Sequence, residues 1–152
     1  MLSRLLALAA AAVVLAPTAA AATLTRPETS ILREMNRVRV ANGLRPLRVD
    51  NHLERAARAH TREMVAANVF DHGAFGSRMM AFKVQGRMTG ENLAWGAGPR
   101  GTPPALVAAW LASPGHRENL LRPQYTRVGV GAYVGRFLGF PGVTLVTTDF
   151  AG

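Results

Sequence analysis

The side chains that could perform chemistry in this chain are those of histidine, serine and the carboxylates, because its 152 residues include no cysteine. That absence excludes a disulfide scaffold, a thiolate nucleophile and a metal site built on cysteine. The chain has four histidines, so a metal site would have to combine imidazole with carboxylate and water. In the run Ser113-Pro114-Gly115-His116, a hydroxyl stands three residues before an imidazole. A serine in such a helix-ending turn far more often caps a helix than acts as a nucleophile, so we do not assign Ser113 that role.

A glycine-rich stretch, residues 96–101, formally matches the dinucleotide-binding pattern G-x-G-x-x-G. That pattern functions only where it leaves a parallel strand inside a βαβ unit and opens a helix that faces the pyrophosphate. Here Pro99 interrupts the turn, and the surrounding chain is too short for a doubly wound sheet. The motifs H-E-x-x-H, G-x-S-x-G and the P-loop do not occur. We therefore expect a loop at this stretch and assign no nucleotide site.

Two amphipathic helices are expected in the first half of the chain. The first is predicted to begin with a capping box formed by Thr25 and Glu28 and to end at Gly43. The second is predicted to begin at residue 50 or 51. Its apolar stripe recurs at helical spacing: Leu53, Ala57, His60, Met64 and Ala67. We therefore expect His60 to pack against the core, whereas His52 is expected to be exposed.

The rest of the chain predicts two further helices, one more helical turn at residues 116–121, and then paired strands. Residues 77–85 are expected to form a short helix, and Thr102 is expected to open another. The apolar period then changes to two along residues 128–134 and 143–150, which are predicted to pair through a hairpin loop at residues 136–142. Helices followed by an antiparallel pair indicate the α+β class.

Arginine dominates the charge of the chain, because 17 arginines and the single Lys83 stand against 9 acidic residues and give a formal net charge of +9. The arginines are scattered, with no basic block and few interleaved aromatic residues, so we expect no nucleic-acid partner. Attraction to anionic cell-envelope polymers or lipids is one explanation of this charge, and a solvated face without a partner is the other. We expect a monomer.

The first 22 residues have the pattern of a secretory signal peptide. Arg4 supplies the positive start, residues 5–15 are an uninterrupted apolar run, and residues 20–22 form a small-residue cleavage site. The run is shorter than the roughly 20 residues that a membrane span needs. We therefore expect residues 1–22 to be removed, which leaves one exported domain, residues 23–152, outside the cell or in the periplasm or envelope. An uncleaved N-terminal anchor is the alternative.

Four stretches, in this order and spacing, resemble the bacterial branch of the family of cysteine-rich secretory, antigen 5 and pathogenesis-related proteins (CAP). They are N-R-V-R with G-L-R-P-L at residues 36–47, A-A-R-A-H-T-R-E-M at 56–64 with F-D-H at 70–72, G-E-N-L-A at 90–94, and W-L-A-S-P-G-H-R-E-N-L-L at 110–121. The V-G-V-G run at residues 128–131 fits the family's next strand. The resemblance extends over about residues 30–150, nearly the whole predicted domain.

This resemblance implies an α-β-α sandwich with a central antiparallel sheet of about three strands, and it places the third strand at residues 90–95. It also implies a cleft that gathers two histidines and two acidic residues, which in some members binds a divalent cation such as zinc. Three of the four positions match here, at His72, Glu91 and His116. The fourth falls at or near Ser113, where this chain has no carboxylate. Two neutral imidazoles and a carboxylate are reasonable ligands for Zn²⁺ or another divalent cation.

Four residues are expected to support this cleft. We expect Asn92 to brace Glu91 from behind, Arg117 and Asn119 to tie the His116 loop to its neighbours, and Trp110 to form core or cleft wall. Their types suit hydrogen bonding and packing rather than catalysis.

Three functions remain open. We favour a secreted binding module whose cleft holds a divalent cation or a small ligand. A hydrolase or peptidase that uses His72, Glu91 and His116, through a metal or as acid and base, is an alternative for which the sequence offers no complete catalytic set. Lipid or sterol binding is another, in an apolar groove edged by residues 96–104.

Overall fold

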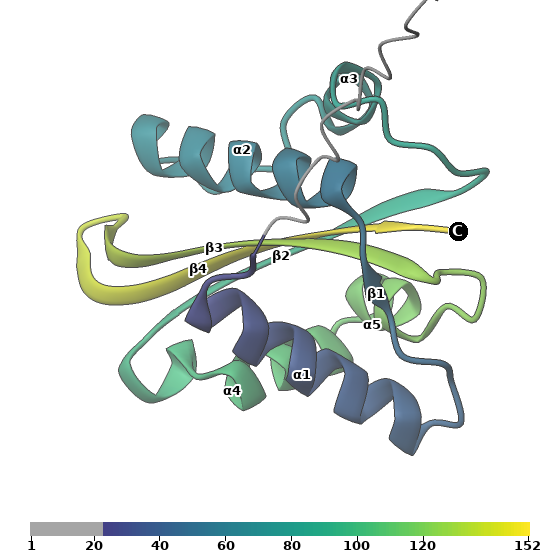
Figure 1. Cartoon of the computed structure of the whole chain (residues 1–152). Coiled ribbons are helices and arrows are strands. Elements are labelled where there is room, and N and C mark those ends of the chain that lie inside the picture. Colours follow the sequence, from purple (N-terminus) through teal and green to yellow (C-terminus); the bar gives the residue numbers. More distant parts are fainter. Residues whose placement is uncertain (1–22) are drawn as a thin grey trace, which may run out of the picture.

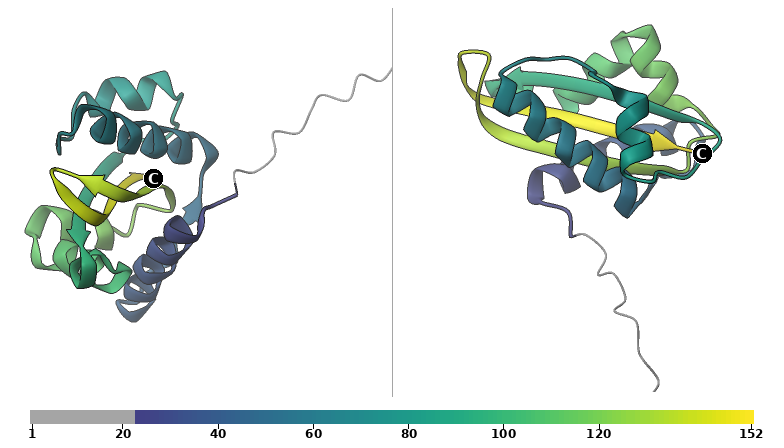
Figure 2. Two further views of the ribbon diagram at one scale, coloured as in Figure 1. Left: turned by 90° about the vertical axis from the view of Figure 1, so that its left-hand side faces the viewer. Right: turned by 90° about the horizontal axis from the view of Figure 1, so that it is seen from above.

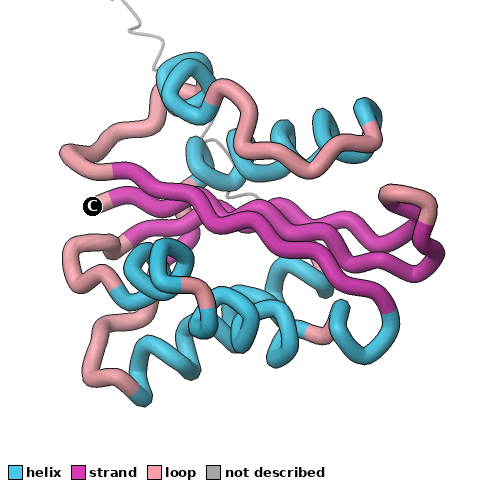
Figure 3. Tube along the Cα trace, turned by 180° about the vertical axis from the view of Figure 1, so that it is seen from behind, coloured by secondary structure: helices cyan, strands magenta, loops and turns pink. Residues whose placement is uncertain are grey.

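The computed structural model describes residues 23–152 and arranges them in three layers (Figure 1). One face of a central sheet is covered by α2 (Asn51–Ala67) and α3 (Phe75–Ala81). The other face is covered by α1 (Arg26–Ala41), α4 (Pro103–Ala112) and α5 (Pro114–Leu121), and Figure 3 shows both helical layers from behind. The predicted α-β-α sandwich is thus confirmed. The predicted signal peptide lies outside the described residues.

The sheet has the strand order β1-β3-β4-β2. The long strands β2 (Thr89–Ala97), β4 (Phe140–Ala151) and β3 (Arg127–Phe137) pair antiparallel, and the short β1 (Arg48–Val49) pairs parallel with β3. The described residues therefore form four strands rather than about three, because the unpredicted two-residue β1 extends one edge. β2 forms the opposite edge, where its residues can be reached from both helical layers.

The hairpin between β3 and β4 is tighter than the sequence predicts. The expected loop at residues 136–142 is wrong, because β3 continues to Phe137 and β4 begins at Phe140. The two residues between them, Leu138 and Gly139, have φ angles of +48° and +83°. Positive φ at both central positions is typical of a type I′ turn, whose twist matches that of the flanking strands.

Two other segments also differ from the expectation drawn from residue patterns. The glycine-rich region forms strand β2 as far as Ala97 before the 3₁₀ turn η1 (Gly98–Gly101), which confirms the strand that the CAP resemblance implied. The third helix covers Phe75–Ala81 instead of residues 77–85. It ends early because Lys83 has a φ of +55°, a left-handed conformation that an α-helix does not continue through.

Predictions at the ends and faces of the first two helices are mostly confirmed. The capping box is present: the Thr25 backbone N–H donates to the Glu28 carboxylate at 2.7 Å, and the Thr25 hydroxyl accepts from the Glu28 N–H at 3.5 Å. His60 is buried, as expected. The exposed position expected for His52 is wrong, because its ring is half-buried with Nδ1 2.8 Å from the carbonyl oxygen of Phe82.

Two glycines of β3 allow α2 to lie very close to the sheet. A Cβ atom at Gly129 would lie 2.0 Å from the carbonyl carbon of Leu53, and one at Gly131 would lie 2.5 Å from the carbonyl oxygen of Ala57. Because both neighbours are backbone atoms of α2, no side chain could turn away to make room. The V-G-V-G run therefore sets the height of α2 above the strands, which Figure 2 shows from two further sides.

The N-x-x-R motif of α1 has a structural role. The Asn36 side chain donates to the carbonyl oxygen of Leu47 at 3.1 Å and accepts from its N–H at 2.8 Å. The Arg39 guanidinium is buried and donates, over 2.8–3.2 Å, to the carbonyl oxygens of Arg45, Leu120, Arg122 and Tyr125. Burial lowers the pKa of Arg39 from its ordinary value. The motif thus joins α1 to the connector before β1 and to the chain that follows α5.

Candidate functional site

Glu91 on β2 is the centre of a buried polar cluster. Its side chain is 2% exposed, its Oε1 accepts a hydrogen bond from His72 Nδ1 at 2.7 Å, and its Oε2 forms an ion pair with the guanidinium of Arg78. His60 Nε2, which donates to the Asp71 carbonyl oxygen at 2.8 Å, lies 4.0 Å from Glu91 Oε2. Both carboxylate oxygens of Glu91 are therefore already engaged by neighbouring side chains.

A second acid, Asp149, faces Glu91 across the sheet. The two residues are directly opposite in the antiparallel register of β2 and β4, so their side chains leave the same face. Asp149 is fully buried, and no N–H group of residues 23–152 donates to its carboxyl oxygens, so its hydrogen-bond partner is the carboxylate of Glu91, to which a protonated Asp149 donates. Burial, and then the negative charge of Glu91, raise the pKa of Asp149 well above its usual range, and Arg78 opposes this only in part. We call Glu91, Asp149, Arg78, His72 and His60 the carboxylate cluster.

Two members of the carboxylate cluster were not predicted. Asp149 could have been identified from the sequence as a candidate site residue, because it is the one ionisable residue in the otherwise uncharged strand at residues 143–150. An acid within a buried strand is rarely present without a partner or a role. Arg78 could not have been identified in this way, since nothing in the sequence from residue 77 to residue 85 indicates that its side chain turns toward Glu91.

His116 lies in the helical layer on the opposite face of the sheet. It is half-buried near the start of α5, whereas Glu91 points toward α2 and α3. Burial, followed by repulsion from the charge of His72, lowers the pKa of His116 and so favours its neutral ring. The edge strand β2 thus separates His116 from the carboxylate cluster, while the two histidines remain close enough to influence each other.

Hydrogen bonds from Asn92, Asn119 and Trp110, three of the residues expected to support the cleft, tie α4 and α5 to β2. The Asn92 amide donates to the His116 carbonyl oxygen at 2.9 Å. The Asn119 amide donates to the carbonyl oxygen of Glu91 and to Oδ1 of Asn92, both at 3.1 Å. Trp110 Nε1 donates to the Leu93 carbonyl oxygen at 2.9 Å. These bonds position His116 relative to Glu91 through the backbone.

Two other predicted site residues, Arg117 and Ser113, lie outside the carboxylate cluster. Arg117 is exposed and borders a separate surface hollow with Pro114 and Glu118, away from the carboxylate cluster. Ser113 stands at the N-cap of α5, but its side chain makes no capping hydrogen bond. It lies instead, together with His116, in the wall of a cavity.

This cavity, which we call the β2–α4 cavity, has a volume of about 480 Å³. Its walls come from the edge strand β2, from α4 and from the residues that flank them: Phe70, Leu93, Ala94, Trp95, Arg100, Ala105, Leu106, Ala109, Trp110, Ser113 and His116. Most of these side chains are apolar. The polar groups are confined to Arg100 on η1 and to the pair formed by Ser113 and His116. Of the predicted edge at residues 96–104, Arg100 is the residue that lines this cavity.

The three predicted metal ligands do not form a three-ligand centre in this arrangement. Among residues 23–152, no group of three or more His, Cys, Asp or Glu side chains is placed to hold a metal ion. His72 and Glu91 are hydrogen-bonded to each other, the Arg78 guanidinium covers the second oxygen of Glu91, and His116 lies in the other layer. The residues therefore do not fit a zinc centre that uses Glu91 as a ligand.

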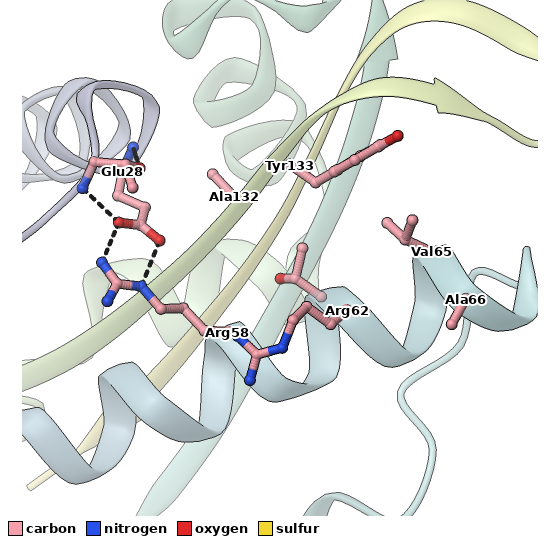
Figure 4. Close-up of a pocket in the computed structure, with 9 residues that line it drawn as sticks. Glu28, Arg58, Arg62, Val65, Ala66, Ala132 and Tyr133 are labelled. Carbon is pink, nitrogen blue, oxygen red and sulfur yellow. Dashed lines mark hydrogen bonds and ion pairs between the residues drawn. The ribbon is translucent and has the colours of Figure 1, made fainter.

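A larger hollow of about 540 Å³ lies between the start of α1, α2 and β3 (Figure 4). In Figure 4 the carboxylate of Glu28 and the guanidinium of Arg58 form an ion pair at its side, and Arg58 Nε donates to Glu28 Oε1 at 2.8 Å. Arg62 also lines this hollow and forms no ion pair among residues 23–152, so the hollow retains one cation, as the β2–α4 cavity does with Arg100. The β2–α4 cavity differs in the aromatic rings of its lining, which are those of Phe70, Trp95 and Trp110.

Comparisons with known proteins agree with this geometry. Residues 32–150 match the model of the cysteine-rich secretory protein family, CAP. The uncharacterized protein YkwD of Bacillus subtilis (strain 168) is 37% identical over 119 residues, which are 75% of this chain and 45% of that protein. The chain therefore spans less than half the length of this curated relative.

Solved structures show the same fold. An extracellular protein containing an SCP domain from Bacillus anthracis superposes with a TM-score of 0.68 at 29% identity, over 86% of this chain and 45% of that one. NaASP2, solved with Zn²⁺, superposes with a TM-score of 0.59 at 13% identity, over 84% of this chain and 82% of that one. The likeness to NaASP2 is one of fold, and its metal belongs to that protein.

Proposed function

The chain belongs to the cysteine-rich secretory protein (CAP) family, and from this premise we propose that it is an exported ligand-binding domain. The ligand site is the β2–α4 cavity. The ligand is a small amphipathic molecule with an apolar body and an acidic head group, of which a fatty acid is the simplest example. The observation that carries this proposal is an apolar cavity with a single cationic side chain, Arg100, beside it.

The size and lining of the cavity suit an apolar body. Its volume of about 480 Å³ lies within the range of about 300–1,000 Å³ that is usual for small-molecule sites. The half-buried ring of Trp95 contributes apolar surface and α4 adds Ala105 and Ala109, while Leu93 and Trp110 lie in the wall as almost fully buried side chains. Transfer of a hydrocarbon chain from water to such walls gains about 25 cal/mol for each Å² that is buried.

The charge at the rim suits an acidic head group. Arg100 is exposed, borders this cavity and an adjoining hollow beside Phe140, and forms no ion pair with a carboxylate of the described chain. A guanidinium fork binds carboxylates and phosphates through two parallel hydrogen bonds. Ser113 and the neutral ring of His116 offer further hydrogen bonds elsewhere in the wall.

Two observations support export. Residues 1–22 have the pattern of a signal peptide, and the similar protein from Bacillus anthracis is described as extracellular. From residue 23 onward, no helix combines the length and the apolar character that crossing a membrane requires.

Hydrolysis receives less support from the geometry. Glu91 is held by His72 and Arg78, so its oxygens are not free to activate water. Within the described residues Ser113 has no hydrogen bond to His116, so no activated hydroxyl is present. The cavity walls, by contrast, are suited to binding alone.

Titration with dodecanoate, below the concentration at which it forms micelles, tests the proposal. Trp95 and Trp110 line the cavity, so their fluorescence reports on an occupant. We expect saturable binding of one dodecanoate per chain. Arg100→Gln is expected to weaken it about tenfold or more through loss of the charged hydrogen bonds, which corresponds to about 1.4 kcal/mol. Ala109→Trp is expected to abolish it by filling the cavity.

A matched control separates a specific site from general attraction to a basic protein. Arg48→Gln removes the same charge from β1, away from the cavity, and should leave the affinity unchanged. Absence of saturable binding would refute the proposal. An equal loss of affinity in Arg48→Gln and Arg100→Gln would also refute it.

A further inference from the structure

The hairpin that joins β3 to β4 projects past both helical layers, at the end of the sheet opposite β1 (Figures 1 and 3). Two large apolar side chains stand exposed on it, since Val134 is 58% exposed and Phe140 is 52% exposed. Pro141, which follows Phe140, is exposed as well. The projecting end of the sheet therefore presents apolar surface to its surroundings.

The sequence of the turn is unusual for a hairpin that faces only water. Residues 137–142 read F-L-G-F-P-G and include no side chain that carries a charge or forms a hydrogen bond. Turns with positive φ at both central positions are usually built from Asn, Asp and Gly. Core packing accounts for Leu138, which lies partly against the cluster around Phe137, but it leaves the exposed half of Phe140 unexplained.

The charged side chains next to this apolar surface are arginines. Arg136 is exposed, and its Nη1 donates to the carbonyl oxygen of Gly139 at 3.0 Å, which holds the guanidinium at the turn. Arg100 borders the hollow that is also lined by Phe140 and Trp95. Neither arginine forms an ion pair within residues 23–152, and no acidic residue occurs from residue 92 to 117 or from 119 to 148. The hairpin thus combines exposed apolar side chains with two cations that lack a carboxylate partner.

We propose that the β3–β4 hairpin docks this domain on a bilayer that contains anionic lipids. Val134, Phe140 and Pro141 enter the boundary between head groups and acyl chains, where apolar side chains gain free energy by leaving water. Arg136 and Arg100 bind the lipid phosphates, which the guanidinium fork matches in shape and charge.

The charges favour a bilayer over a second copy of this chain. In a symmetric dimer the same patch faces itself, so Arg136 and Arg100 of one copy would lie against those of the other without a carboxylate between them. A soluble anionic polymer would pair with the arginines, yet it offers no apolar phase to Phe140 and Val134. An anionic bilayer meets both requirements at one surface.

Docking by this hairpin places the β2–α4 cavity beside the bilayer. Trp95 and Arg100 line both that cavity and the hollow next to Phe140. The rings of Trp95 and Phe140 are in contact, with centres 5.6 Å apart. An acidic amphiphile then passes between bilayer and cavity at the hairpin. This exchange rests on the proposed function, whereas the docking itself does not.

Cosedimentation with lipid vesicles tests the docking. Residues 23–152, which contain every helix and strand of the described structure, are used so that the apolar run at residues 5–15 does not contribute. We expect binding to vesicles of equal parts phosphatidylcholine and phosphatidylglycerol, and far weaker binding to phosphatidylcholine alone. Val134→Ser/Phe140→Ser should bind the mixed vesicles about tenfold or more weakly. Arg136→Gln should bind them about fivefold more weakly.

Matched variants separate the hairpin from a general attraction between a basic protein and anionic lipid. Val40→Ser/Met80→Ser changes apolar side chains that are 59% and 74% exposed on α1 and α3, and Arg48→Gln removes a charge at the opposite end of the sheet. Both should keep the affinity of the unaltered domain. Their circular dichroism, and that of the hairpin variants, should be native because all these side chains are exposed.

A fluorescent label shows which part of the domain enters the lipid. The chain has no cysteine, so Val134→Cys and Met80→Cys each accept a single environment-sensitive fluorophore. On mixed vesicles the emission of the label at residue 134 should shift to shorter wavelength, and that of the label at residue 80 should not.

Each outcome decides the proposal. Absence of binding to the mixed vesicles would overturn it, as would equal losses in Val134→Ser/Phe140→Ser and Val40→Ser/Met80→Ser. Dimers that form without lipid and are abolished by Phe140→Ser, as measured by sedimentation equilibrium, would assign the hairpin to a second copy of the chain and overturn it too. Vesicle binding that depends on the hairpin would stand even if the dodecanoate titration failed, and only the exchange of ligand would then be refuted.

Discussion

Glu54 makes the stability of the domain fall as the pH rises toward neutrality. Its side chain is fully buried in α2, and its Oε2 accepts a hydrogen bond from the Val130 N–H at 3.0 Å. The Arg58 guanidinium lies 2.8 Å from Oε1 but without the alignment of a hydrogen bond. Burial above all, and then the negative charge of Glu28, raise the pKa of Glu54 to about 7 from an ordinary value of 4.5. The native protein therefore retains a proton here that the unfolded chain releases.

The sign and size of the effect follow from proton linkage. Between pH 4.5 and about pH 7 the unfolded state binds fewer protons at Glu54 than the native state does, so the free energy of unfolding decreases with pH. The difference between the two pKa values, at about 1.36 kcal/mol for each pH unit, corresponds to about 3 kcal/mol. This contribution is fully present below pH 4.5 and is lost as the pH rises through about 7.

Glu54→Gln tests this reasoning, because glutamine has the shape of a protonated glutamate and retains an oxygen for the Val130 N–H. Urea unfolding of both proteins between pH 4.5 and pH 8 should show the variant gaining about 3 kcal/mol relative to the unaltered protein as the pH rises. Asp149 contributes a decline of the same sign to both proteins, so the difference isolates Glu54. Glu34→Gln is the control: the hydrogen bond from Arg37 lowers the pKa of Glu34, so its effect has the opposite sign and lies in the acid range. Parallel stability curves for Glu54→Gln and the unaltered protein would refute the account.

Three further substitutions test the framework around the site by chemical or thermal unfolding. Arg39→Leu removes the guanidinium from four carbonyl oxygens, of which that of Arg122 keeps the Tyr125 N–H as a donor, and should cost about 3–5 kcal/mol, whereas an effect below about 1 kcal/mol would contradict the role given to the N-x-x-R motif. Gly131→Ala places a methyl group against the backbone of α2 and should cost about 3 kcal/mol, while the same change at Gly76, where a Cβ meets no atom within 4 Å, should cost far less. Trp110→Phe leaves the Leu93 carbonyl oxygen unpaired and should cost about 2 kcal/mol; unchanged stability would show that this bond does not hold α4 to β2.

Sequence patterns were informative wherever one physical cause dominated. The period of the apolar residues located both long helices and placed His60 on the buried stripe of α2, and the Thr25 and Glu28 pattern located the start of α1. β2 was found only through the CAP resemblance. Its residues Gly90, Glu91 and Asn92 interrupt the apolar alternation, because they serve the polar cluster and the bonds to α5 rather than the core.

The candidate site was predictable only in part, for a reason of geometry. His72, Glu91 and His116 could be selected from motifs, yet only the register of β2 with β4 brings Asp149 opposite Glu91. Arg78 belongs to α3 and reaches Glu91 from 13 residues earlier in the chain, so the pair exists only because α3 packs over the sheet near β2. Contacts made across the sheet by residues far apart in sequence leave no local pattern to detect.

Nuclear magnetic resonance of the ¹⁵N-labelled protein during titration with dodecanoate tests the central claim most directly, because it locates the ligand as well as detecting it. Saturable shifts are expected at the indole N–H groups of Trp95 and Trp110 and at the amides of Ala105 and Ala109, all of which line the β2–α4 cavity. Shifts centred instead on the hollow beside Arg58 and Tyr133, or no saturable shifts at all, would contradict it.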